Sequence, residues 1–202
     1  YGGVESKTYD FLEWFVSGSI NRSKATRSFV INVTGLGAQA KYTGALAGVK
    51  VNFGKKFSIN KNLFVAPVAS LQYLLIHQGA YQETGSVAAL RVSNKKNIGI
   101  LTVGAGLRLG ETYGEYWLVG TRALRMMLTY DAISPQQVTT ANFVVGSNSF
   151  TMVNSPERVA LNLGADYALT VCKNTTVQLV YNLQLRRGYY ENFLEAKLRY
   201  LL

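Results

Sequence analysis

The sequence has few of the residues that most metal sites and covalent cross-links require. It contains one cysteine, Cys172, and one histidine, His77, in 202 residues. A lone cysteine forms no internal disulfide, and one histidine and one cysteine far apart do not make a zinc pattern. The acidic residues lack the spacing of a calcium-binding loop. We therefore expect no metal ion and no cofactor.

Long apolar runs are also missing. No window approaches 18 consecutive apolar residues, so the sequence offers no transmembrane helix. Proline is rare, with 3 residues, whereas there are 19 glycines and 13 tyrosines. The apolar content of 48% is too high for a disordered chain. This composition favours long strands with aromatic belts over a helical enzyme.

Acidic residues are outnumbered, because 21 Lys and Arg face 11 Asp and Glu and give a net charge of +10. Basic pairs fall at predicted turns, at 55–56, 95–96 and 186–187. They are either solvated strand ends or contacts to anionic head groups and lipopolysaccharide phosphates at a membrane surface. No basic helix or nucleic-acid reader motif accompanies the charge, so we expect no nucleic-acid partner.

What the sequence does contain is a strict alternation of apolar and other residues. Over 158–172, 175–187 and 189–202, nearly every second side chain is apolar. A period of two is the period of a strand, because successive side chains point to opposite faces of a sheet. Strands this long, with an apolar stripe along their whole length, are typical of a sheet whose outer face meets lipid.

The pattern predicts an all-β fold, an antiparallel transmembrane β-barrel. Eight long strands are expected, at 8–20, 38–54, 62–77, 97–110, 115–130, 157–172, 175–187 and 189–202. Arg122 and Arg125 fall on opposite faces of the fifth, so one of them must snorkel or a bulge must shift the register. Residues 86–92 either extend the fourth strand or form a short separate one.

The predicted connections alternate in length. Those at 55–61, 111–114 and 173–174 are short, whereas those at 21–37, 78–96 and 131–156 are long, with a tight turn at 188 on the same side as the long ones. Outer-membrane barrels have this asymmetry, with short periplasmic turns and longer extracellular loops. We therefore expect a bacterial outer-membrane location with the C-terminus on the periplasmic side.

Charged residues on the non-apolar side of the strands are predicted to face the lumen, since a charge in lipid at mid-depth costs a few kcal/mol. They are Lys50, Arg108, Arg158, Asp166, Arg186, Glu191, Glu195, Lys197 and Arg199. Both signs occur on adjacent strands. One interpretation is a structural network of ion pairs, and the other is a hydrophilic conduit; the two are compatible.

Aromatic residues near the predicted strand ends suit girdles at the membrane interfaces, where amphipathic rings settle at head-group level. These residues are Tyr73, Tyr113, Tyr116, Trp117, Tyr130, Tyr189, Tyr190 and Tyr200.

A catalytic site would have to be built around His77. A serine hydrolase needs a nucleophile and a base within hydrogen-bond reach, but Ser70 on the same strand is seven residues away, roughly 23 Å. We therefore expect no enzyme. An outer-membrane lipid hydrolase that uses His77 is kept as the enzyme-class hypothesis.

Three stretches carry a resemblance to a known family. GVKVNFGKKFSINKNLFVAPVASLQYLLIHQGAYQETGS, NFVVGSNSFTMVNSPERVALNLGADYAL and VQLVYNLQLRRGYYENFLEAKLRYLL occupy 48–86, 142–169 and 177–202. In strand and loop spacing they resemble the C-terminal translocator domain of type V autotransporters, and within that family the surface-antigen autotransporters of intracellular α-proteobacteria. The resemblance spans residues 8–202.

The resemblance implies an outer-membrane translocator that anchors and helps export a covalently linked upstream passenger, inserted by the barrel assembly machinery. It also implies a twelve-stranded barrel, so residues 1–202 would form the autotransporter β-barrel domain without its first strands and linker helix. The alternative is an eight-stranded adhesin-type barrel that binds partners through 78–96 and 131–156.

Overall fold

Antiparallel strands make up most of the computed structural model. It describes residues 2–5, 10–31, 34–86, 88–92, 96–115, 118–146, 148–172 and 175–200. Nine strands follow one another in a single sheet: β1 (Gly2–Glu5), β2 (Asp10–Ile31), β3 (Thr34–Lys55), β5 (Leu63–Gln78), β8 (Lys96–Glu115), β9 (Leu118–Ile133), β12 (Val159–Cys172), β13 (Thr175–Arg186) and β14 (Tyr189–Tyr200). The two-residue β4 (Phe57–Ser58) pairs beside β5. Eight of these strands are long, and the predicted all-β antiparallel fold is confirmed.

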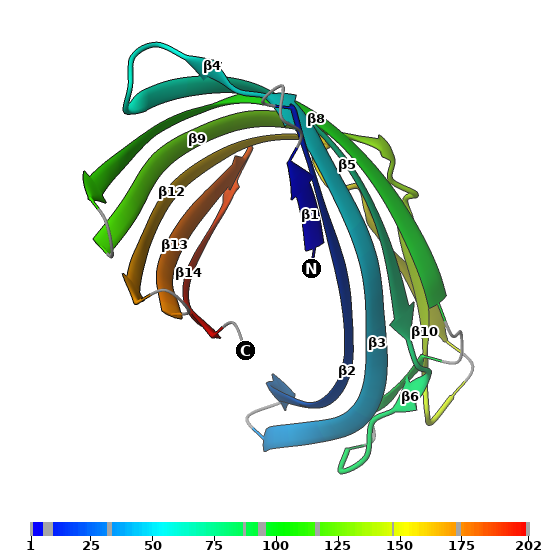
Figure 1. The fold of residues 1–202 in the computed structure, drawn as a ribbon. Helices are drawn as coiled ribbons and strands as arrows, with labels where there is room; N and C mark the ends of the chain where they lie inside the picture. The colour runs from blue at the N-terminus through cyan, green and yellow to red at the C-terminus, as the bar shows by residue number, and fades with distance from the viewer. Residues whose placement is uncertain are drawn as a thin grey trace.

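The sheet curls into a half-barrel, with β14 facing β1 and β2 across the opening (Figure 1). The side chains themselves reveal the concave face. Arg108 Nη1 on β8 lies 3.7 Å from Glu13 Oε1 on β2, although β3 and β5 separate these strands. Three strand spacings would hold them roughly 14 Å apart in a flat sheet. Their face is therefore the inside of the curl.

Apolar side chains cover the convex face. Along β8 and β9, alternate residues such as Val103, Leu107, Leu124 and Leu128 are exposed, whereas their neighbours in sequence are partly covered on the concave side. An exposed apolar surface of this extent is what a lipid-facing sheet presents. Within the described residues, no helix is long and apolar enough to cross a membrane.

Two expected connections are wrong. Residues 21–37 were expected to form a loop, but β2 and β3 stay paired up to Ile31 and Thr34. The expected turn at 111–114 lies inside β8, which continues to Glu115. In both places the alternation ends before the strand does. Lipid contact imposes the apolar period, whereas the ladder of backbone hydrogen bonds continues beyond the lipid.

The remaining long connections are also not irregular loops. They form a four-stranded sheet, here called the cap, in the order β11 (Ser149–Asn154), β10 (Gln137–Phe143), β7 (Leu90–Val92) and β6 (Tyr81–Gln82). Strand β7 accounts for part of 86–92, as a short separate strand. Leu90, Val92 and Ala141 form a small buried cluster, against which Tyr81 and Phe143 pack.

The cap is attached to the extended β2–β3 hairpin. Arg27 Nη2 donates to Glu83 Oε2 at 2.6 Å, and the same carboxylate oxygen accepts the Leu90 amide at 2.9 Å. The backbones of Gln39 and Thr84 exchange two hydrogen bonds of 2.9 Å. Glu83 is 8% exposed, so its carboxylate is a buried acceptor on which three segments depend.

Replacing Glu83 by Gln tests this attachment. The neutral amide removes the charge that faces Arg27 in this contact, and we expect the cap to lose about 1–3 kcal/mol of local stability. Limited proteolysis of the purified full chain in mild detergent then cuts the segment 79–95 several-fold faster. Glu157→Gln, an exposed carboxylate at the same end of the sheet, is the control and leaves the rate unchanged. Equal rates for both variants would show that the ion pair does not hold the cap.

Candidate functional site: the concave polar face

Most of the charged residues predicted to face the lumen lie on the concave face. Their cross-strand partners place Lys50, Arg108, Asp166, Arg186, Glu191, Glu195 and Lys197 on this side of their strands. Arg158 precedes β12 and is exposed. Arg199 pairs with Thr176 in the ladder, and its side chain lies outside the described part of the structure.

One group of polar contacts joins β8, β9 and β13. Arg186 Nη1 donates to Asp131 Oδ2 at 2.7 Å and to the Glu157 carbonyl at 2.5 Å, while Thr102 Oγ1 donates to Asp131 Oδ1 at 2.7 Å. Asp131 is 4% exposed. Both of its oxygens are therefore satisfied, and a buried carboxylate in this state holds strands that are not neighbours at a fixed distance.

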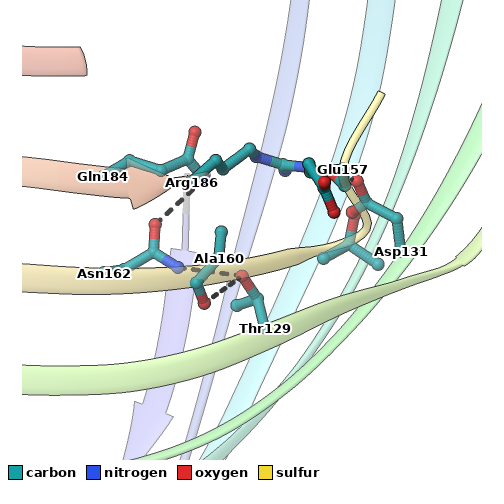
Figure 2. A network of polar contacts seen from close by, with 8 residues as sticks. Thr129, Asp131, Glu157, Ala160, Asn162, Gln184 and Arg186 are labelled. Carbon is teal, nitrogen blue, oxygen red and sulfur yellow. Dashed lines mark hydrogen bonds and ion pairs between the residues drawn. The ribbon is translucent and has the colours of Figure 1, made fainter. Parts of the chain in front are cut away.

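A neutral relay runs beside it across β9, β12 and β13 (Figure 2). Gln184 Nε2 donates to Asn162 Oδ1 at 3.1 Å, and Asn162 Nδ2 donates to Thr129 Oγ1 at 2.9 Å. Thr129 Oγ1 in turn donates to the Ala160 carbonyl at 3.2 Å. Each hydrogen bond passes from one strand to the next, so the relay fixes the register of three strands on their polar side.

A second ion pair crosses β12 further along the strands. Arg125 Nη2 on β9 donates to Asp166 Oδ1 at 2.9 Å and to Asn182 Oδ1 on β13 at 3.0 Å. It passes over Gly164, where an added Cβ would lie 3.0 Å from Nη2. The missing side chain at Gly164 is therefore what lets the guanidinium cross a whole strand.

The third group comes from the other side of the curl. Asn52 Nδ2 donates to Glu13 Oε2 at 3.3 Å, and Arg108 Nη1 approaches Glu13 Oε1 at 3.7 Å. On β14, Lys197 Nζ lies 2.9 Å from Glu195 Oε2. The concave face thus carries charges of both signs along the whole width of the sheet.

Three central residues of these contacts were not among the predicted site residues. Arg125 and Glu13 fell within expected strands, but an apolar–polar alternation gives no partner for a charge. Asp131 was placed in the loop 131–156, whereas it belongs to β9. Its position continues the concave series of Arg125, Met127 and Thr129, which is the signal that would have found it.

The two arginines of β9 do lie on opposite faces. Arg122 is on the convex side, where its Nη2 lies 2.6 Å from Glu111 Oε2 and its guanidinium lies 5.9 Å from the centroid of the Tyr113 ring. Arg122 lies near the start of β9 and is well exposed, so its side chain can snorkel towards water. The ladder continues through this part of β9 without a bulge.

The aromatic residues predicted to form girdles occupy different positions. Tyr73, Tyr130 and Tyr190 are exposed on the convex face, and Tyr113 packs against Tyr167 with ring centroids 6.4 Å apart. Tyr189 is on the concave side and donates to Glu191 Oε2 at 3.3 Å. Tyr116, Trp117 and the Tyr200 side chain lie outside the described residues. The interfacial role of this group stays a prediction.

The hypothetical catalytic pair is separated by the sheet. His77 is on the convex face, where its Nδ1 lies 2.7 Å from Asn97 Oδ1, while Ser70 is buried on the concave face. The two side chains point to opposite sides of β5, so they cannot act together. No group of three potential metal ligands occurs among the residues searched, which are those the structure describes.

Comparison with known proteins gives one family. The model described as "Autotransporter beta-domain" matches residues 1–182. No curated protein matches the chain. The family match gives no support to the alternative of an eight-stranded adhesin-type barrel, and it does not test the likeness to the surface-antigen autotransporters of α-proteobacteria, which stays a prediction.

The buried carboxylate at Asp131 provides a direct test of the concave network. Asp131→Asn removes the charge that faces Arg186, and we expect a loss of about 2 kcal/mol of stability, because a hydrogen bond to a charged group contributes roughly that much. The measurement is the temperature at which the folded band of the full chain converts to the unfolded band in electrophoresis. Glu191→Gln, an exposed carboxylate on the same face, leaves that temperature unchanged. A variant as heat-resistant as the parent would rule out a structural role for the pair.

Proposed function

The chain belongs to the autotransporter β-domain family, and we propose that it anchors an upstream passenger in the bacterial outer membrane and helps to export it to the cell surface. The domain is an outer-membrane translocator barrel. Its part in export would be that of a pore and an anchor, with no chemical step of its own.

The observation that carries this proposal is the concave face. Several of its charges are held by contacts between strands, as in the Arg125–Asp166 and Arg186–Asp131 pairs. A polypeptide in transit exposes backbone amides and side chains of both kinds, and a surface with fixed, mutually satisfied charges offers it no strong binding site. Such a surface supports passage better than one with a large excess of either charge.

Closure of the barrel is part of the proposal. Strand β14 ends the sheet on one side, and on the other side, within the part of the chain that the structure describes, β1 pairs with residues 11–14 of β2 and leaves the rest of that edge of β2 without a neighbouring strand. Further strands and a linker helix upstream of Tyr1 would pair with these edges and fill the lumen. In this proposal the predicted lumenal residues line the conduit, and the predicted aromatic residues lie at the two membrane interfaces.

We further propose the orientation and the partners. The cap and the extended β2–β3 hairpin would face outward, and the short connections and the C-terminus would face the periplasm. Insertion would use the barrel assembly machinery, and the convex face would contact lipid and lipopolysaccharide.

An inserted epitope tests the orientation. In the β10–β11 turn, Gly146 has a φ of +100° and no atom within 4 Å of the position that a Cβ would take, so we expect a tag to be tolerated there. Antibody added to intact cells is expected to bind this tag. A tag between Asn60 and Lys61, in the short connection after β4, is expected to bind antibody only after the outer membrane is permeabilised. The reverse pattern would contradict the orientation.

Bulk on the concave face tests the conduit. Gln72 and Gln178 lie on the concave side of β5 and β13, and replacing both by Trp narrows the lumen. In the full-length chain, we expect passenger to reach the cell surface several-fold more slowly, measured by its accessibility to protease over time.

The matched control puts the same bulk on the other face. Leu71→Trp with Leu179→Trp changes the neighbouring residues, which are exposed on the convex side. This pair is expected to export passenger at the parental rate. Equal export by both double variants, with equal heat resistance, would show that the concave face is not the path.

A further inference from the structure

Three cations gather on the extended hairpin just beyond the apolar band. On the convex face of β2, the apolar band runs from Leu12 to Ile20. Arg22 and Lys24 occupy the next two positions on the same face. Lys41 lies on β3 directly opposite Lys24. Nine residues of a tilted strand cross the hydrocarbon core, so these cations fall at the level where hydrocarbon ends.

The cluster concentrates three like charges at one place on the hairpin. Lys24 and Lys41 form a directly opposed pair, a position in which like charges destabilise a sheet. Among the described residues, no carboxylate forms an ion pair with Arg22, Lys24 or Lys41. Glu83, which belongs to the adjoining cap, is engaged by Arg27 on the opposite side of β2. A repulsive arrangement of this kind is relieved when an anion binds between the cations.

The three cations also share one hollow. Arg22, Lys24 and Lys41 line a shallow depression of about 240 Å³, together with Ser23, Tyr42 and Thr43. This volume is several times the roughly 30 Å³ that one water molecule occupies in the liquid. The positive charge that an anion would need and the space for it therefore occur at the same place.

The surroundings identify the class of anion. Ile20 and, beyond Gly18, Val16 precede the cluster on the convex face of β2, and they are 78% and 74% exposed. A ligand whose anionic group sits on the three cations would lay any attached hydrocarbon along these two side chains. A soluble anion would leave that apolar surface unused, whereas a phosphorylated lipid covers both surfaces.

We propose that Arg22, Lys24 and Lys41 bind the phosphate groups of a lipopolysaccharide-type glycolipid in the outer leaflet, with its acyl chains against Val16 and Ile20. The inference rests on the proposed orientation, because only an outward-facing hairpin meets that leaflet. It gives the contact between the convex face and lipopolysaccharide a defined place on the β2–β3 hairpin.

The test uses the full-length protein extracted from outer membranes in mild detergent. Mass spectrometry measures the phosphorylated glycolipid retained per chain. Arg22→Gln, Lys24→Gln and Lys41→Gln together are expected to lower this amount several-fold. The control is Lys55→Gln, Lys56→Gln and Lys61→Gln, which removes three positive charges at the other end of the strands and is expected to have no effect. Unchanged retention in the first variant overturns the site.

Added ligands separate the possible sources. Stripped protein is expected to rebind the phosphorylated glycolipid, and to bind its dephosphorylated form, phosphatidylglycerol or inorganic phosphate at least several-fold more weakly. Equal binding of inorganic phosphate or phosphatidylglycerol would overturn the glycolipid assignment. A failure of the orientation gives a different result, because the control variant would then lose glycolipid and the epitope after β10 would be hidden on intact cells.

Discussion

Pairing of the backbone is the constraint on which this structure depends. Hydrocarbon offers no hydrogen-bond partner, so each strand that meets lipid must find its partners in the strands beside it. The ladders meet this demand over long continuous stretches, as from Leu63 to Gln78 between β5 and β8. Once the backbone is fixed in this way, side chains have only two directions available. The apolar residues lie on the convex face, and the charged residues at the level of the apolar band lie on the concave face.

The contents of the concave face follow from that division. Side chains that converge inside a curl come from strands that are not neighbours, which is how Arg108 reaches Glu13 and Arg186 reaches Asp131. The contacts that define the polar interior are therefore long-range, and they fix the curvature as well as the register. A surface suited to passage and a framework that maintains the curl are made by the same side chains.

The sequence was informative where lipid imposes a period and uninformative elsewhere. β12, β13 and β14 were predicted within two residues at each end, because apolar and polar residues alternate along their whole length. The outer half of β2 (21–31) and the start of β3 (34–37) were missed, since Ser23, Ala25 and Thr26 follow no such period in an aqueous setting. The partners of Arg125 and Asp131 were also out of reach, because a pattern assigns a residue to a face but cannot tell which residue of another strand will meet it there.

The cap has a consequence for the order of folding. Its β7–β10 pairing joins Arg91 to Asn142, about 50 residues apart in the chain, whereas neighbouring strands of the main sheet meet through much shorter connections. Closing a longer segment costs more chain entropy and slows assembly. Strands β8 and β9 lie between these two segments, so pairing them into a hairpin first shortens the loop that the cap has to close. An ordered cap is thus a late event, one that records the completed assembly of the strands beneath it.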